Sequence, residues 1–153
     1  MRSKIELQKK ALDIASVIAA ALHDTAAALQ EVNGLPRVLV VDDNRDAALS
    51  LGAVLQALGA DVRVTHDGES ALEELAAFHP AAVLLDIGMP GMDGYEVAGR
   101  IRKHPECNGT VLIALTGWGQ ERDRHRTTVA GFNHHLVKPA EIGDLQGLLA
   151  KLA

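Results

Sequence analysis

The spacing pattern of apolar and polar positions changes once along the chain. Across residues 3–32, apolar side chains recur every three or four positions with no Gly or Pro between them, which predicts one long helix that Gly34 and Pro36 end. After that point short apolar runs alternate with helical patterns. The apolar runs predict strands at 38–41, 61–65, 81–85, 110–115 and 134–137. The patterns between and after them predict helices at 46–58, 69–78, 94–103, 120–130 and 141–152.

The predicted strands are apolar at nearly every position, so they indicate a sheet that is covered on both faces. Strands that alternate with helices of this length are typical of a parallel sheet. Five such units predict an α/β fold, a flavodoxin-like, doubly wound sheet of five parallel strands in the order 2-1-3-4-5. We therefore divide the chain into an amino-terminal helix at 1–34, which we expect to dimerise or to transmit a signal, and a second domain at 35–153.

Composition narrows the function classes. Of the 153 residues, 48% are hydrophobic and 23% charged, which is typical of a globular protein. Residues 1–34 carry four basic and four acidic groups, so the net charge of -5 belongs to the rest of the chain, and no basic stripe favours direct nucleic-acid binding. The longest low-charge run, 14–22, is too short to insert into a membrane. The only cysteine, Cys107, is expected on a loop as a free thiol, which favours a reducing cytoplasm.

Polar residues stand where the predicted strands end. They are Asp42 and Asp43, Asp86, Thr116 and Lys138. Ligands of a doubly wound sheet bind beyond the carboxyl ends of its strands, near the switch in strand order, so we expect these side chains to form one pocket. Taken alone, Asp86 is better explained by a turn into the Gly- and Pro-rich segment that follows, and Asp42 alone could cap a helix, although capping explains two adjacent aspartates poorly.

Three carboxylates brought together repel one another, so they demand a proton or a cation. Hard oxygen ligands favour Mg²⁺, which readily shares a site with phosphate oxygens. A carboxylate beside Mg²⁺ is a candidate nucleophile for phosphoryl transfer, and Lys138 and Thr116 could contact the phosphoryl oxygens. The pocket therefore predicts self-phosphorylation on an aspartate.

Four separated motifs resemble the response-regulator receiver domain of two-component signalling. They are VLVVDDN at 38–44, LLDIGMPGMDG at 84–94, ALTG at 114–117 and VKP at 137–139. The resemblance implies that Asp86 is the phosphoacceptor, that Asp43 and Asp86 bind Mg²⁺ directly, and that Asp42 acts largely through water. It further implies a metal contact from the Gly88 backbone carbonyl, a switch hydroxyl on Thr116 and an ion-pairing role for Lys138.

The resemblance also implies a partner and one departure from the family pattern. The donor would be a sensor histidine kinase or a phosphotransfer protein, and the chain would catalyse only its own phosphorylation and dephosphorylation. Segments 116–126 and 131–139 resemble most the receivers at the carboxyl ends of hybrid sensor histidine kinases. The family usually places an aromatic switch residue three positions before the lysine, and this chain has His135 there.

Two other functions stay open at this point. A Mg²⁺-dependent phosphohydrolase with an aspartyl-phosphate intermediate uses a similar Asp, Thr and Lys set. However, enzymes resembling the haloacid dehalogenase group carry a further Asp two residues after the nucleophile, where this chain has Gly88. The second alternative is a scaffold that forms a homodimer through its amino-terminal helix and is not phosphorylated.

Overall fold

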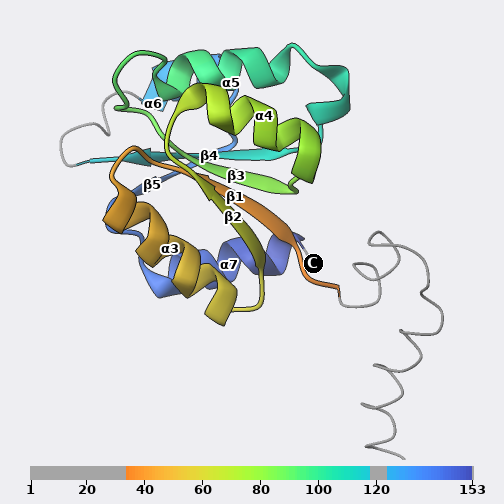
Figure 1. Ribbon diagram of the computed structural model, residues 1–153, viewed down its shortest axis with the longest axis vertical. Coiled ribbons are helices and arrows are strands. Elements are labelled where there is room, and N and C mark those ends of the chain that lie inside the picture. The colour runs from red at the N-terminus through yellow and green to blue at the C-terminus, as the bar shows by residue number, and fades with distance from the viewer. Residues whose placement is uncertain (1–33, 118–123, 153) are drawn as a thin grey trace, which may run out of the picture. The chain divides into compact units, whose positions relative to one another are not determined.

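The computed structural model describes residues 34–117 and 124–152, in which strands and helices alternate (Figure 1). The strands are β1 (Arg37–Val41), β2 (Asp61–Thr65), β3 (Ala82–Asp86), β4 (Val111–Thr116) and β5 (His134–Val137). The helices are α3 (Arg45–Ala57), α4 (Gly68–Phe78), α5 (Gly94–Arg102), the short 3₁₀ helix η2 (Pro105–Cys107), α6 (Arg124–Ala130) and α7 (Ile142–Leu152). The predicted helix at 3–32 lies outside the described residues, and the division of the chain at residue 34 stays a prediction.

The five strands form one parallel sheet in the order β2-β1-β3-β4-β5, which confirms the predicted topology. After β1 the chain builds β2 on one side, and it then crosses to place β3 on the other side of β1. The register pairs Val41 with Leu85 and Asp86 with Leu115. The carboxyl ends of β1, β3 and β4 therefore meet at one edge of the sheet.

Helices cover both faces of the sheet, with α4, α5 and α6 on one face and α3 and α7 on the other (Figure 1). Successive strand residues point to opposite faces, so each strand supplies both cores. In β1, Leu39 and Val41 pack with residues of α4 and α5, whereas Val38 and Val40 pack with residues of α3 and α7. This double burial explains why residues 38–41 of β1 are all apolar. Among the described residues, no helix combines the length and apolarity that crossing a bilayer requires.

The helix starts differ from the predicted ones by one residue where a side-chain cap fixes them. Asn44 caps α3 by accepting a hydrogen bond from the Ala47 N–H, and Asp67 caps α4 in the same way from the Ser70 N–H. Asp93 caps α5, which begins where the sequence predicted. A cap satisfies backbone N–H groups that the first helical turn leaves without partners. The predicted start of the helix at residue 120 falls outside the described residues.

The expectation of a loop at Cys107 was wrong. The residue ends the 3₁₀ helix η2, which Pro105 begins, and its side chain is buried in the core beneath α4 and α5. Burial raises the pKa of the Cys107 thiol above its ordinary value. The thiol is free, as expected, but its place is the core rather than the surface.

Arg102, the last residue of α5, ties three segments together. Its Nε donates to the Gly131 carbonyl (3.0 Å), Nη1 to the Cys107 carbonyl (2.8 Å) and Nη2 to Asn133 Oδ1 (2.8 Å). Gly131 leaves room for this side chain, because a Cβ there would lie 2.7 Å from Arg102 Cγ. The guanidinium thus joins α5, η2 and the turn before β5 through hydrogen bonds that only its planar fork can make at once.

We predict that Arg102→Lys lowers the free energy of unfolding by about 2 kcal/mol, because a lysine cannot replace all three hydrogen bonds and leaves partly buried carbonyls without donors. Arg100→Lys is the matched control. Arg100 lies on the same helix, but it makes an exposed pair with Glu96, which contributes about 0.5 kcal/mol at most. Urea denaturation of both variants tests the prediction, and equal losses would contradict the role assigned to Arg102.

Candidate functional site

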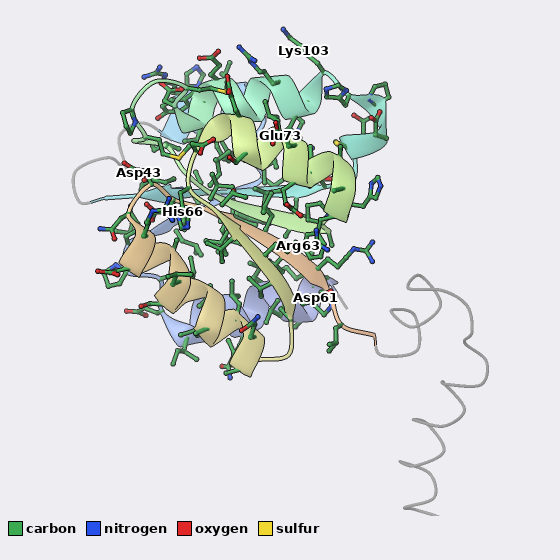
Figure 2. All side chains as sticks on the ribbon, viewed as in Figure 1. Asp43, Asp61, Arg63, His66, Glu73 and Lys103 are labelled. Atoms are coloured by element: carbon green, nitrogen blue, oxygen red, sulfur yellow. The ribbon has the colours of Figure 1, made fainter. Side chains whose placement is uncertain are left out.

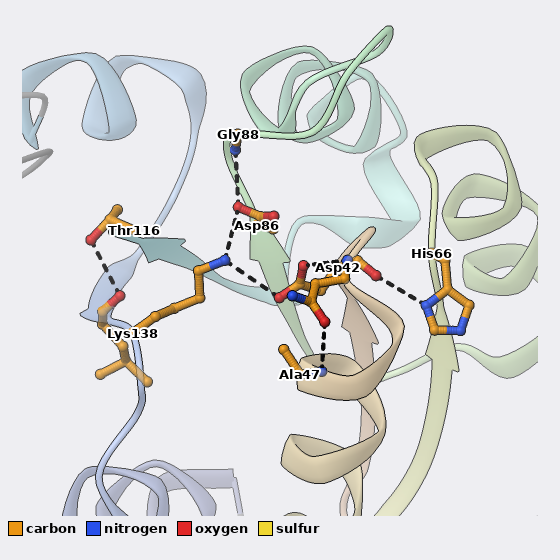
Figure 3. A network of polar contacts seen from close by, with 9 residues as sticks. Asp42, Ala47, His66, Asp86, Gly88, Thr116 and Lys138 are labelled. Atoms are coloured by element: carbon orange, nitrogen blue, oxygen red, sulfur yellow. Dashed lines mark hydrogen bonds and ion pairs between the residues drawn. The ribbon is translucent and has the colours of Figure 1, made fainter. Parts of the chain in front are cut away.

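The carboxyl edge of the sheet brings the predicted site residues together (Figure 3). Asp42 directly follows β1, Asp86 ends β3, and Lys138 directly follows β5. Lys138 Nζ lies 3.5 Å from both Asp42 Oδ2 and Asp86 Oδ1. The lysine therefore bridges two carboxylates that come from different strands. The site is half-open, because the Asp42 and Asp86 side chains are buried while that of Lys138 is 34% exposed.

The three predicted acidic residues form a cluster. Carboxylate oxygens of Asp42, Asp43 and Asp86 lie within 4.8 Å of one another, with Asp43 on the exposed side. Three negative charges at this distance face one nearby ammonium, so the cluster has an excess of negative charge. All the side-chain donor atoms are hard oxygens, which is the ligand type that Mg²⁺ prefers. The residues present thus fit a small divalent cation.

Asp42 is held by its neighbours rather than acting as a helix cap. Its Oδ1 accepts a hydrogen bond from the Asn44 N–H (3.0 Å), and Asn44 itself caps α3. On the other side, His66 Nδ1 donates to the Asp42 main-chain carbonyl (3.0 Å). His66 was not predicted from the sequence as a site residue, although one signal was available. His66 directly follows β2 and so stands at the same sheet edge as the other site residues.

Asp86 combines a turn role with an unusual environment. Its Oδ1 accepts the Gly88 N–H (3.0 Å), a two-residue bond typical of an aspartate that opens a turn. The pKa of Asp86 is raised to about 6, chiefly by burial and also by the neighbouring Asp42, against the lowering effects of the Gly88 N–H and Lys138. The turn interpretation was therefore correct but incomplete, because the same carboxylate is buried beside a second acid.

Thr116 ends β4, but its hydroxyl faces β5. Thr116 Oγ1 donates to the Leu136 carbonyl (3.3 Å), and the Lys138 N–H donates to the Thr116 carbonyl (2.7 Å). His135 is half-buried, directly precedes Leu136, and pairs with Ala114 of β4. The switch roles of Thr116 and His135 stay predictions, although both residues adjoin the same junction of β4 and β5.

Gly88 leaves the entrance to Asp86 uncrowded. A Cβ at this position would lie 3.7 Å from Asp86 Oδ1, so a longer side chain would extend over the carboxylate. The glycine is exposed, and its N–H already orients Oδ1. The metal contact expected from its carbonyl stays a prediction.

A doubly wound parallel sheet with an acidic, lysine-bearing carboxyl edge is the architecture of a signalling receiver. Residues 38–150 match the family described as the response regulator receiver domain, and the chain belongs to this family. It is a receiver domain of two-component signalling. The likeness to carboxyl-terminal receivers of hybrid kinases stays a prediction.

Several known proteins are similar to this chain. It is 30% identical over 120 residues to Protein PilG of Pseudomonas aeruginosa, covering 78% of this chain and 88% of PilG. The receiver domain of sensor histidine kinase PA1611 from Pseudomonas aeruginosa PAO1 is 30% identical, with a TM-score of 0.70 over 77% of this chain and 97% of that domain. Its structure has a magnesium ion coordinated in the active site cleft.

The chemotaxis response regulator CheY4 of Vibrio cholerae is 25% identical, with a TM-score of 0.71 over 78% of this chain and 99% of that structure. Other curated relatives are longer. The chain spans about half the length of several transcriptional regulatory proteins, 46% in one case and 49% in another. No function of this chain is inferred from the parts of those proteins that it does not match.

We predict that Asp86→Asn stabilises the fold when chelator removes divalent cations. The folded-state pKa of about 6 exceeds the ordinary 3.8, so ionisation of Asp86 costs stability as the pH rises through this interval. Asparagine does not ionise. The gain should be absent below about pH 4 and reach about 1 kcal/mol above about pH 7, a figure reduced for solvent screening.

Urea denaturation across this pH range measures the effect, with Asp144→Asn on the exposed surface of α7 as the control. The control should change the free energy of unfolding by less than about 0.5 kcal/mol. A pH-independent difference between Asp86→Asn and the parent protein would refute the electrostatic explanation.

Proposed function

We propose that this receiver accepts a phosphoryl group on Asp86 from a phosphohistidine of a sensor histidine kinase or phosphotransfer protein. A carboxylate oxygen of Asp86 attacks the phosphorus, an oxygen–phosphorus bond forms, and the bond from phosphorus to the histidine nitrogen breaks. The observation that carries the proposal is the buried Asp86 carboxylate, 3.5 Å from Lys138 Nζ and clustered with Asp42 and Asp43. Self-phosphorylation and dephosphorylation are the only reactions assigned to the chain.

The acidic cluster is proposed to hold Mg²⁺. Asp43 and Asp86 would bind it directly, Asp42 largely through water, and the Gly88 carbonyl would complete the protein ligands. When bound, the ion supplies positive charge beside the carboxylates and the incoming phosphoryl oxygens. The raised pKa of Asp86 supports this assignment, because burial and the neighbouring Asp42 disfavour the negative charge of the carboxylate more than the Gly88 N–H and Lys138 favour it.

Lys138 would contact a phosphoryl oxygen on the side facing β5. It already lies against Asp86 Oδ1, and its main chain is fixed by the bond to the Thr116 carbonyl. Thr116 would then turn its hydroxyl from the Leu136 carbonyl to another phosphoryl oxygen. This change frees the Leu136 carbonyl, and His135 next to it would repack, so that the surface of β4, α6 and β5 differs between two states.

We infer a cytoplasmic location, because a phosphohistidine donor of two-component signalling and a single unpaired cysteine both suit that compartment. A homodimer through residues 1–34 is proposed on the sequence pattern alone. The phosphohydrolase and the unphosphorylated scaffold are the alternatives to the receiver chemistry. Gly88, in place of a second catalytic aspartate, argues against the first of them.

We predict that acetyl phosphate with Mg²⁺ adds one phosphoryl group to the chain and that Asp86→Asn abolishes the addition. Asp43→Asn should weaken Mg²⁺ binding and slow phosphorylation at least about tenfold, since loss of a metal-site carboxylate has effects of this order. Intact-protein mass spectrometry with and without chelator measures the product.

Asp46→Asn is the matched control, because Asp46 is an exposed acid close to Asp43 in sequence, in the first turn of α3. It should be phosphorylated like the parent protein. Label retained on the Asp86→Asn protein would overturn the phosphoacceptor assignment. Repeated turnover of small phosphomonoesters would favour the hydrolase, and a chain that dimerises without binding Mg²⁺ would favour the scaffold.

The switch generates a separate prediction for Thr116. Thr116→Val keeps the shape of the buried side chain but removes the hydroxyl, so it should be phosphorylated yet lose most of the structural response. Thr116→Ser keeps the hydroxyl and should retain the response. The structural response is measured by the changes in amide chemical shifts of β5 when beryllofluoride, a phosphoryl mimic, is added. An unchanged response in Thr116→Val would show that Thr116 has no role in the switch.

A further inference from the structure

A cavity of about 720 Å³ lies at the amino edge of the sheet, away from Asp86. Residues from the carboxyl ends of α4 and α5 and from η2 line it, and none of them belongs to the acidic site. The helices α4 and α5 lie on the same face of the sheet (Figure 1). Its lining comprises Leu72, Leu75, Ala76, His79, Pro80, Arg100, Lys103, His104, Glu106, Cys107 and Thr110. A volume of roughly 300–1,000 Å³ is usual for sites that take small molecules.

The floor of this cavity is apolar. Leu75, Pro80 and Cys107 are buried, and Leu72 is partly buried against the same core. The burial that raises the pKa of Cys107 keeps its thiol uncharged at neutral pH, so the floor carries no negative charge. A ring or short alkyl chain would find a surface of matching polarity here.

The rim is predominantly basic. Arg100, Lys103, His79 and His104 face one carboxylate, Glu106. Arg100 already pairs with Glu96 at 2.7 Å, and His104 lies 3.8 Å from Glu106. In the part of the chain that the structure describes, no carboxylate pairs with the Lys103 ammonium, which stands at the end of α5 (Figure 2). Lys103 is therefore the cation that remains available to an anionic group.

His79 adds an observation from the backbone. It caps α4 in the left-handed conformation (φ 52°, ψ 60°), where glycine is usually favoured. The residues with φ in this region that the structure describes are otherwise all glycines, at 34, 59, 91 and 131. A side chain that remains at a strained position and lines a cavity is more readily explained by a contact it makes there than by helix stability.

We propose that this cavity binds a small organic anion with an apolar body. The body would lie on the floor formed by Leu75, Pro80 and Cys107, and the anionic group would lie at the rim beside Lys103 and His79. The proposal does not depend on phosphorylation of Asp86, because the two sites occupy opposite edges of the sheet.

Naphthalene-2-carboxylate is the probe, with its neutral carboxamide and the cationic 2-naphthylmethylamine as matched controls. Calorimetry at low salt should show that the carboxylate binds more tightly than the carboxamide and the amine do. Added salt should weaken the binding of the carboxylate. Lys103→Gln should weaken carboxylate binding roughly two- to fivefold, as expected for one exposed charge. Lys151 is an exposed lysine on α7, and Lys151→Gln should leave carboxylate binding unchanged.

A filled cavity tests the location of the site. Ala76 is exposed and lines the cavity, whereas its neighbour Ala77 is exposed and does not. Ala76→Trp should abolish binding, and Ala77→Trp should leave it unchanged. Far-ultraviolet circular dichroism and urea denaturation report that each variant is folded, and unchanged binding to Asp86→Asn separates this site from the proposed function.

Cys107 provides a readout inside the cavity, because it is the only cysteine of the chain. Bound carboxylate should slow its alkylation by N-ethylmaleimide, and the slowing should follow the calorimetric binding curve. Equal affinity for the three probes, unchanged binding to Ala76→Trp, or no detectable binding of the carboxylate would each overturn the proposal.

Discussion

The structure depends on one unfavourable juxtaposition, the burial of Asp86 beside Asp42. A buried carboxylate is costly unless it is paired, and here the nearest cation, Lys138, is shared between two acids at 3.5 Å each. Burial, together with the charge of Asp42, raises the pKa of Asp86 to about 6, which reflects this cost. The chain crossing that places β3 next to β1 creates the contact, and the junction with β4 and β5 brings in the lysine. The order of the strands in the sheet therefore determines which charged side chains lie together at its carboxyl edge.

The sequence predicted the sheet well because burial on both faces leaves a plain signal. Residues 38–41 of β1 include no polar residue, which indicates a strand in the interior of the sheet. The predicted strand order then placed the carboxyl ends of β1 and β3, and with them Asp42 and Asp86, next to each other. The contacts that orient these residues leave no such signal. The hydrophobic pattern of a sequence indicates which positions are buried, but it does not indicate which hydrogen-bond donor pairs with which acceptor. The bond from His66 to the Asp42 carbonyl and the bond from Thr116 to Leu136 both depend on that pairing.

Helix α5 links the two edges of the sheet. At its start, Gly94 packs so closely on β3 that a Cβ there would lie 2.6 Å from the Asp86 carbonyl oxygen. At its other end, Arg102 bonds to the segments around η2 and β5, and Lys103 stands at the rim of the cavity. α5 therefore contacts Asp86 at one end and supplies residues of the cavity rim at the other.

The proposed switch is consistent with the strengths of the bonds involved. The present bond from Thr116 Oγ1 to the Leu136 carbonyl joins two neutral groups at 3.3 Å, and such bonds contribute about 0.5–1.5 kcal/mol. A phosphoryl oxygen is a charged acceptor, for which the contribution is about 1.5–3 kcal/mol. The hydroxyl should therefore exchange one partner for the other once Asp86 is phosphorylated. Lys138 would not need to move far, because it already contacts Asp86, so Thr116 is the residue whose partner distinguishes the two states.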